Sequence, residues 1–269
     1  MNNIQKLIIL SLLATSGLAW ILSFVTTDTM MNTMMIVNYN LLNILLFTVI
    51  WTSGMIAMMF PSIIPMILLY NKIIIQKDKS NTLLISKENK TIYSLKTILF
   101  TATYIVVWTI VGLILFFGWS LSMNNFVIKY ISNNDQVNIL FGIILIIAGG
   151  YQFTSLKKKC IGYCESPLTF FSRRWHNGTI GAIKMGTYHG LYCLGCCWPY
   201  FLLMVALGWM NIACMSLFAG IIFGEKIWSK GIWISRFTGI AFAILGILTV
   251  SGTITLYNDS MNTHSMNMS

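Results

Sequence analysis

Residues 184–226 read KMGTYHGLYCLGCCWPYFLLMVALGWMNIACMSLFAGIIFGEK, and the rest of the chain is interpreted around this stretch. Its first half places His189, Cys193, Cys196 and Cys197 in otherwise apolar sequence. Because an α-helix turns about 100° per residue, the first three of these side chains fall within about 60° of one another. The spacing therefore predicts a helix with a metal-binding face.

Thiolates and imidazole together suit Cu(I), Zn(II) or an iron–sulfur unit. The alternative is that cysteine packs in a core like any small hydrophobic residue. Two further cysteines upstream, one helical turn apart, add to the set and favour the metal. The candidate metal ligands are His189, Cys193, Cys196, Cys197, Cys160 and Cys164.

The composition is that of a polytopic membrane protein. Of 269 residues, 57% are hydrophobic and only 9% are charged. In a soluble protein, a net charge of +10 would suggest binding to nucleic acid. In a membrane protein, the Lys and Arg residues instead indicate which side of the bilayer each loop occupies, so no nucleic-acid partner is expected. We predict an all-α bundle of about seven transmembrane helices, forming a single multi-pass domain over residues 1–269 in the cell membrane.

The predicted helices are Leu7–Val25, Leu41–Tyr70, Thr97–Trp119, Val137–Thr154, Gly186–Leu207, a short helix ending at Glu225, and Ile232–Leu256. The first could instead be a cleaved signal peptide, because Gly17-Leu18-Ala19 is a plausible cleavage site, but we favour its retention. Four segments outside the helices are predicted as an outer loop (26–40), two basic cytoplasmic loops (71–96 and 155–185) and an outer tail (257–269).

The basic residues predict the orientation. With a cytoplasmic N-terminus and seven helices, every Lys and Arg except Lys129 falls on the cytoplasmic side. This is the asymmetry that the positive-inside rule requires. The C-terminus is then outside, on the same face as loop 26–40.

The 17 methionines are clustered, and thioethers are soft donors that suit Cu(I) better than zinc or iron. The outer loop carries Met30, Met31, Met34 and Met35. The predicted accessory ligands are Met55, Met59 and Met66 on one side of the second helix, and Met261, His264, Met266 and Met268 in the tail. The alternative for the helical methionines is ordinary packing. The metal is therefore predicted to be copper, with zinc and iron as alternatives.

Glu225 ends the sixth predicted helix and is followed by Lys226. If helices five and six form a hairpin, its carboxylate could accept a hydrogen bond from the imidazole of His189 and orient it. The alternative is a surface ion pair between Glu225 and Lys226.

Several short motifs together resemble a family of uncharacterised bacterial and archaeal proteins described as predicted metal-binding integral membrane proteins. The matching residues are Trp51, Met55, Ala57, Met58, Met59, Pro61, Ser62 and Pro65; Tyr151-Gln152, Leu156-Lys157, Cys160, Cys164 and Ser166-Pro167; and His189-Gly190, Tyr192 to Trp198, Met210-Asn211 and Glu225-Lys226. The resemblance implies a metal-binding membrane protein. It covers neither the first helix nor the two outer Met-rich segments.

The prediction is a metal-binding membrane protein that handles copper by transport, insertion or sensing. One alternative is a non-catalytic subunit of a larger membrane enzyme complex. Another is a thiol–disulfide oxidoreductase in which the helix-five thiols exchange electrons with Cys160 and Cys164. Reactive thiols favour exposed positions, so no enzyme activity is expected.

Overall fold

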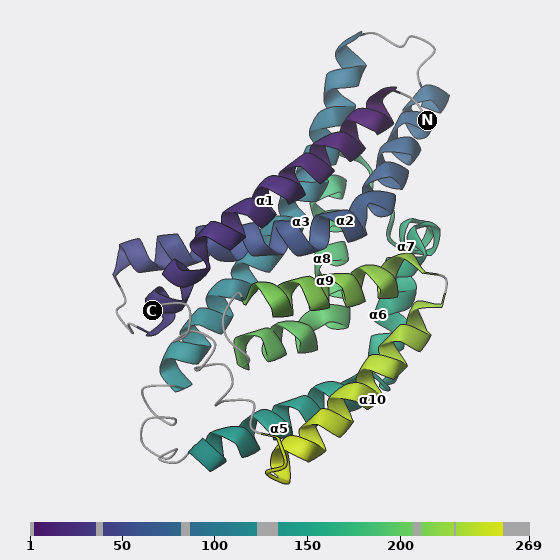
Figure 1. Cartoon of the computed structure of the whole chain (residues 1–269). Coiled ribbons are helices and arrows are strands. Elements are labelled where there is room, and N and C mark those ends of the chain that lie inside the picture. The colour runs from purple at the N-terminus through teal and green to yellow at the C-terminus, as the bar shows by residue number, and fades with distance from the viewer. Residues whose placement is uncertain are drawn as a thin grey trace.

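A computed structural model describes residues 3–35, 40–81, 87–122, 134–206, 211–228 and 230–254, and these residues form nine α-helices (Figure 1). The helices are α1 (Asn3–Met35), α2 (Leu41–Asn81), α3 (Lys87–Ser122), α5 (Asn134–Tyr151), α6 (Ser155–Glu165), α7 (Pro167–Arg174), α8 (Gly178–Ala206), α9 (Ile212–Ile227) and α10 (Gly231–Val250). The all-α prediction is confirmed.

Four helices are long and apolar enough to cross a membrane: within residues 5–27, 41–76, 95–121 and 231–250. A fifth span is obtained if α5 and α6, which meet at a bend of 65°, count as one broken span. By length and composition, the described residues thus give four or five spans, fewer than the seven that the sequence predicts. Of the predicted spans that do not qualify, α9 has only 16 residues, too few to cross the hydrocarbon core of a bilayer.

The helices also extend further than the hydropathy predicted. Segment 26–40 is helical as far as Met35, and segment 71–96 is helical up to Asn81 and again from Lys87. Segment 155–185 contains α6, α7 and the start of α8. An apolar run marks only the part of a helix that contacts lipid. Lys, Gln and similar residues are good helix formers, so the same helix can extend beyond the membrane into water. The tail with Met261, His264, Met266 and Met268 lies outside the described residues.

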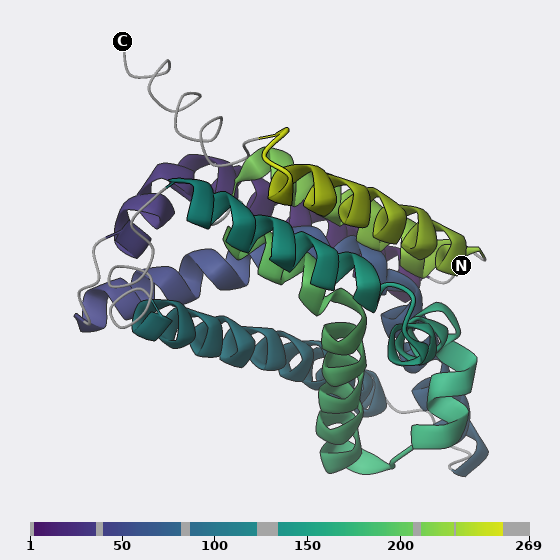
Figure 2. The same ribbon diagram turned by 90° about the horizontal axis from the view of Figure 1, so that it is seen from below.

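Helices α1, α2 and α3 pack side by side, and α3 continues the contact to α8 (Figures 1 and 2). The Ser16 hydroxyl of α1 donates to the carbonyl of Ala57 on α2 at 2.9 Å. The indole N–H of Trp51 on α2 donates to the carbonyl of Trp108 on α3 at 3.0 Å. The polar atoms of these two side chains thus form hydrogen bonds to the neighbouring helix, as buried polar groups need to do in an apolar interior.

Helices α5 and α10 form a second closely packed pair, seen side by side in both views (Figures 1 and 2). A Cβ atom at Gly149 would lie 2.8 Å from the carbonyl oxygen of Gly239, and one at Gly246 would lie 2.7 Å from that of Gly142. Glycines at these four positions let the two backbones touch, which is how membrane helices commonly associate.

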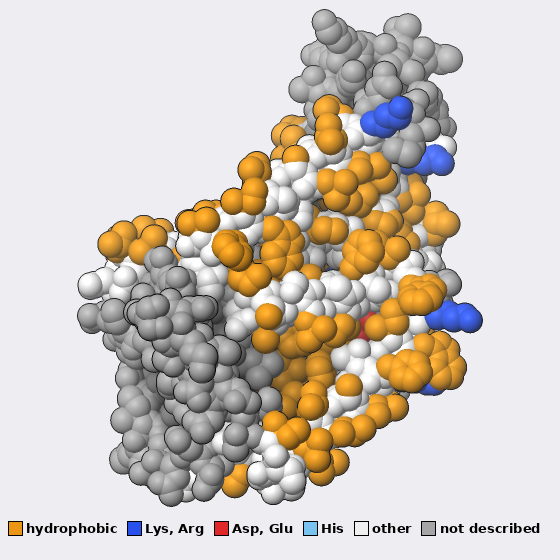
Figure 3. Space-filling view, viewed as in Figure 1, with side chains coloured by type: hydrophobic (Ala, Val, Ile, Leu, Met, Phe, Trp, Pro, Cys, Tyr) orange, Lys and Arg blue, Asp and Glu red, His pale blue; other side chains and the backbone are white. Residues whose placement is uncertain are grey.

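The surface is extensively apolar. Figure 3 shows hydrophobic side chains over much of one face, while the Lys and Arg side chains visible in that view lie along one edge. On α10, for example, Trp233, Phe237 and Ile240 are exposed. Such a surface is unusual for a soluble monomer and suits contact with lipid.

The bend between α5 and α6 turns the chain towards α8. Thr154 begins α6, and its hydroxyl accepts a hydrogen bond from the backbone N–H of Lys157. Pro167 begins α7 immediately afterwards. As a result α6 packs against α8, beside the cysteines that the sequence singled out.

Candidate metal centre

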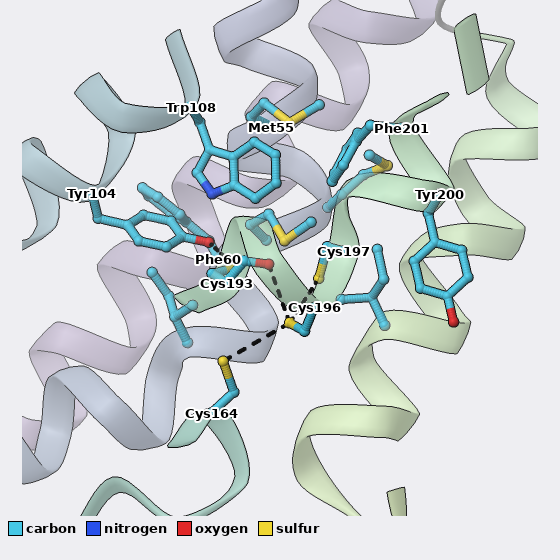
Figure 4. Packing of buried hydrophobic residues seen from close by; sticks show 14 of the residues in the cluster. Met55, Phe60, Tyr104, Trp108, Cys164, Cys193, Cys196, Cys197, Tyr200 and Phe201 are labelled. Atoms are coloured by element: carbon cyan, nitrogen blue, oxygen red, sulfur yellow. Dashed lines mark hydrogen bonds between the residues drawn. The ribbon is translucent and has the colours of Figure 1, made fainter. Parts of the chain in front are cut away.

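Three cysteines of α8 form one group of thiols (Figure 4). The Sγ atoms of Cys193, Cys196 and Cys197 all lie within 4.8 Å of one another, and each side chain is at most 1% exposed. The Sγ atoms of Cys196 and Cys197 are 3.2 Å apart. These three residues are called the α8 thiols below. The predicted clustering of these thiols is therefore present in the structure.

The local sequence of α8 explains how this turn is held. Pro199 has no N–H, so the carbonyl of Gly195, four residues earlier, has no partner within the helix. The hydroxyl of Tyr151, at the end of α5, donates to that carbonyl at 2.5 Å. The turn that carries the α8 thiols is thus fixed from a neighbouring helix.

Helix α6 brings a fourth thiol to the group. The Sγ of Cys164 lies 3.9 Å from that of Cys196. Cys160, one turn earlier, packs against Gly195, where a Cβ atom would lie 2.8 Å from its sulfur. A side chain at position 195 would therefore force the Cys160 sulfur to move. All six cysteines of the chain are free thiols.

A buried cation lies against the α8 thiols. Lys226 of α9 is 5% exposed, and its Nζ lies 2.9 Å from the Sγ of Cys193. The same ammonium contacts the Ser62 hydroxyl at 3.5 Å and the thioether of Met59 at 3.7 Å. The Tyr104 hydroxyl also hydrogen-bonds to Cys193, at 3.1 Å. A cation beside a thiol favours the thiolate, which is the form that binds metal ions.

Glu225 belongs to a separate buried network. Its Oε2 accepts from the Nζ of Lys157 at 2.8 Å, and its Oε1 accepts from the hydroxyl of Tyr200 at 2.5 Å. Lys157 also donates to the carbonyl of Cys196 at 2.6 Å and lies 4.7 Å from the centre of the Tyr200 ring. The ion pair joins α6 to α9, with both side chains about 1% exposed.

This network corrects two expectations. Glu225 neither accepts from His189 nor forms a surface pair with Lys226. Lys157 and Lys226 were counted among cytoplasmic surface charges, yet both are buried in the bundle. Sequence position alone could not show this, because each follows an apolar segment as an ordinary interfacial lysine would.

His189 lies one helical turn before Cys193 but outside the group formed by the α8 thiols. Its ring stacks on Phe100 and Tyr104, with centroids 5.9 and 5.3 Å away, and meets Phe170 edge-on. Both ring nitrogens are buried, and neither has a hydrogen-bond partner in the described part of the chain. The imidazole is therefore available for a ligand.

The methionines predicted as accessory ligands on α2 are all buried: Met55, Met59 and Met66 are at most 2% exposed. They pack in the main hydrophobic cluster, and Figure 4 shows Met55 near Trp108 above the α8 thiols. Of these three, Met59 reaches the site through its contact with Lys226.

Four residues at the site were not predicted as functional: Lys157, Lys226, Tyr104 and Tyr200. A signal existed for two of them, because Lys157 and Lys226 fall within the short motifs that carry the family resemblance. A lysine inside a metal-binding motif could have been read as a buried partner of the thiols. The tyrosines gave no signal in an aromatic-rich chain.

Comparison with known proteins identifies the family. No curated protein and no solved structure matches the chain. Residues 48–249 match the PpoB2 family, which is described as a copper chaperone. This range is about three quarters of the chain, and it contains every residue of the site described above. It leaves out α1 and the C-terminal tail. The chain therefore belongs to the PpoB2 family of copper chaperones.

Proposed function

We propose that this protein is a membrane-embedded copper chaperone in which Cys193, Cys196 and Cys197 bind one Cu(I) ion and pass it to an acceptor by exchange of thiolate ligands. The observation that carries the proposal is the geometry of the α8 thiols, which lie within 4.8 Å of one another and are almost completely buried. Three free thiols this close together supply a compact set of soft donors for one metal ion.

The family match favours Cu(I) over zinc, because the matching family is described as a copper chaperone. The donor set fits this choice, since soft thiolates suit Cu(I) as well as zinc and iron–sulfur clusters. The orphaned imidazole of His189 is one turn away and can add a nitrogen donor after a side-chain movement. Cu(I) is the cargo that the site is built to hold and release.

The membrane location is proposed from the four or five apolar helices. We place the N-terminus in the cytoplasm and the C-terminus outside, which requires the five spans obtained when α5 and α6 together cross the membrane once. The positive-inside asymmetry holds even when the buried Lys157 and Lys226 are left out of the cytoplasmic total. Lys129 is still the single basic residue on the predicted outer side. A cysteine introduced at the exposed Arg174 should then react with an impermeant maleimide only from the cytoplasmic side. Reaction from the outer side would reverse the orientation.

Metal analysis tests the metal assignment. The protein should be purified without a His tag, loaded with Cu(I) and with Zn(II) in parallel, and analysed for both metals. We expect one copper per chain in the wild type and loss of that copper in the double variant Cys193→Ser/Cys196→Ser. Cys214→Ser is the matched control, because Cys214 is a half-buried thiol of α9 outside the group.

Two results would reject the proposal. One is equal copper content in the double variant and in the control variant. The other is a wild-type protein that retains zinc but not Cu(I). A thiol–disulfide oxidoreductase is not favoured, because the α8 thiols are too deeply buried to meet the thiol of a protein substrate.

A further inference from the structure

The α8 thiols are poorly placed to exchange copper with anything outside the bundle. Their exposed fractions are 0%, 1% and 0% for Cys193, Cys196 and Cys197. Transfer of Cu(I) between proteins proceeds by ligand exchange, so a thiol of the incoming partner must come within bonding distance of the metal. A chaperone with only these three thiols would hold its cargo out of reach.

Cys164 differs from them in position and in exposure. It is carried by α6 rather than α8, and it is 9% exposed. It lies in the last turn of α6, one residue before the helix ends at Glu165. Its neighbour Tyr163 is half-buried, and its ring packs at a tilt against that of Tyr192 on α8, with the ring centroids 4.6 Å apart, while Gly162 is exposed. This end of α6 therefore borders the surface of the protein.

Cys196 connects Cys164 to the buried group. Its sulfur lies 3.2 Å from that of Cys197 and 3.9 Å from that of Cys164. In Figure 4 the dashed lines from Cys196 run to Cys197 on one side and to Cys164 on the other. One thiol is thus shared by a buried pair, Cys196 with Cys197, and by a more exposed pair, Cys196 with Cys164.

We infer that Cys164 is the thiol through which Cu(I) enters and leaves the buried site. The inference rests on the proposed function, since it assigns a route to the copper that the α8 thiols bind. Cys164 is an exchange ligand and not part of the resting site. Cys160, on the same helix, has no such role because it packs against Gly195.

The transfer step moves one metal–sulfur bond at a time. Copper starts on Cys193, Cys196 and Cys197; a bond from copper to the Cys164 sulfur forms, and the bond to the Cys197 sulfur breaks. The proton that leaves the Cys164 thiol is balanced by the proton that the Cys197 thiolate takes up. Copper remains Cu(I), so no electron is transferred. The incoming acceptor thiolate then replaces Cys164 in the same way.

The rate of copper removal tests this route. Protein loaded with one equivalent of Cu(I) is mixed with the chelator bathocuproine disulfonate, and the coloured copper complex is followed with time. Wild type, Cys164→Ser and the control Cys160→Ser are compared. We expect Cys164→Ser to keep its copper stoichiometry but to release copper more slowly, by about tenfold or more, because the thiol nearest to the surface among those around Cys196 is lost.

Three outcomes overturn the inference while leaving the proposed function intact: release from Cys164→Ser at the wild-type rate, an equal slowing in Cys160→Ser, or complete loss of copper from Cys164→Ser. The last would make Cys164 a resting ligand. A wild-type protein that binds no Cu(I) would instead reject the proposed function.

Alkylation of the wild-type protein provides a test that needs no variant. Iodoacetamide is added to metal-free and copper-loaded protein, and the modified cysteines are identified by mass spectrometry. Cys164 should react before the α8 thiols in both samples, because the resting copper leaves it free. Protection of Cys164 by copper to the same extent as Cys196 would overturn the inference.

Discussion

Replacing Lys157 by methionine is expected to destabilise the protein strongly. Met has about the length of the Lys side chain but no charge, so the change isolates the ammonium. Its loss removes hydrogen bonds to Glu225 at 2.8 Å and to the Cys196 carbonyl at 2.6 Å. Glu225, 1% exposed, would keep only its bond from Tyr200.

The magnitude follows from the charge left behind. Removing one partner of a buried ion pair typically costs about 3–5 kcal/mol, because the other charge stays in an apolar environment without compensation. For a chain of this size, about 2–4 °C of melting temperature corresponds to each kcal/mol, so the expected loss is on the order of 10 °C. The metal-free protein in detergent would be melted with tryptophan fluorescence as the signal.

Two further variants separate this cause from general damage to α6. Lys158→Met alters the adjacent, exposed lysine and should change the melting temperature little. The double variant Lys157→Met/Glu225→Gln removes both charges and keeps an acceptor for Tyr200, so it should melt higher than Lys157→Met alone. A single Lys157→Met variant as stable as Lys158→Met, or a double variant less stable than either single one, would refute the reasoning.

The remaining predictions concern packing and charge. Gly149→Ala should destabilise by about 1–3 kcal/mol because its Cβ would meet the α10 backbone, whereas Gly150→Ala, with nothing within 4 Å, should be neutral or stabilising in thermal unfolding. Gly195→Ala should push α6 outward, seen as faster alkylation of its cysteines; unchanged rates would argue against the close contact. His189→Phe should not lower the melting temperature of the metal-free protein, because neither ring nitrogen has a partner to lose; a large drop would reveal an unseen polar contact. Lys226→Met should weaken Cu(I) binding in a competition titration while Lys226→Arg retains it; equal affinities would show that the cation plays no part.

The sequence predicted the part of the site that depends on one helix. Cys193, Cys196 and Cys197 are spaced to meet on a single helical turn, so the periodicity of α8 alone brings their sulfurs together. Cys164 was also predicted as a ligand. Its distance to Cys196, however, depends on the bend between α5 and α6, and the hydropathy of the sequence does not predict that bend. The all-α class followed from the length of the apolar runs.

The sequence could not predict the partners of the buried charges, because these depend on which side of each helix faces the rest of the protein. Glu225 and Lys226 are adjacent, and a surface ion pair between them was the simplest expectation. In the structure, α9 directs Glu225 to Lys157 and Lys226 to Cys193. Neighbours in sequence point about 100° apart on a helix, so the two charges reach different partners where α9 packs against α2, α6 and α8.

The buried charges around the α8 thiols are consistent with one Cu(I) ion on the three α8 sulfurs, two of them present as thiolates and one as a neutral thiol. Among the residues whose burial the structure describes, the buried ionisable Lys and Glu side chains are Lys157, Lys226 and Glu225. Lys157 and Glu225 neutralise each other as an ion pair, which leaves the single positive charge of Lys226 next to Cys193. Cu(I) with two thiolates carries one negative charge, so the loaded site and Lys226 together are neutral. Zn(II) with the same two thiolates is already neutral and would leave the ammonium uncompensated in an apolar core, which is costly. In the proposed function, the charge of α9 therefore favours Cu(I) over Zn(II) at this site.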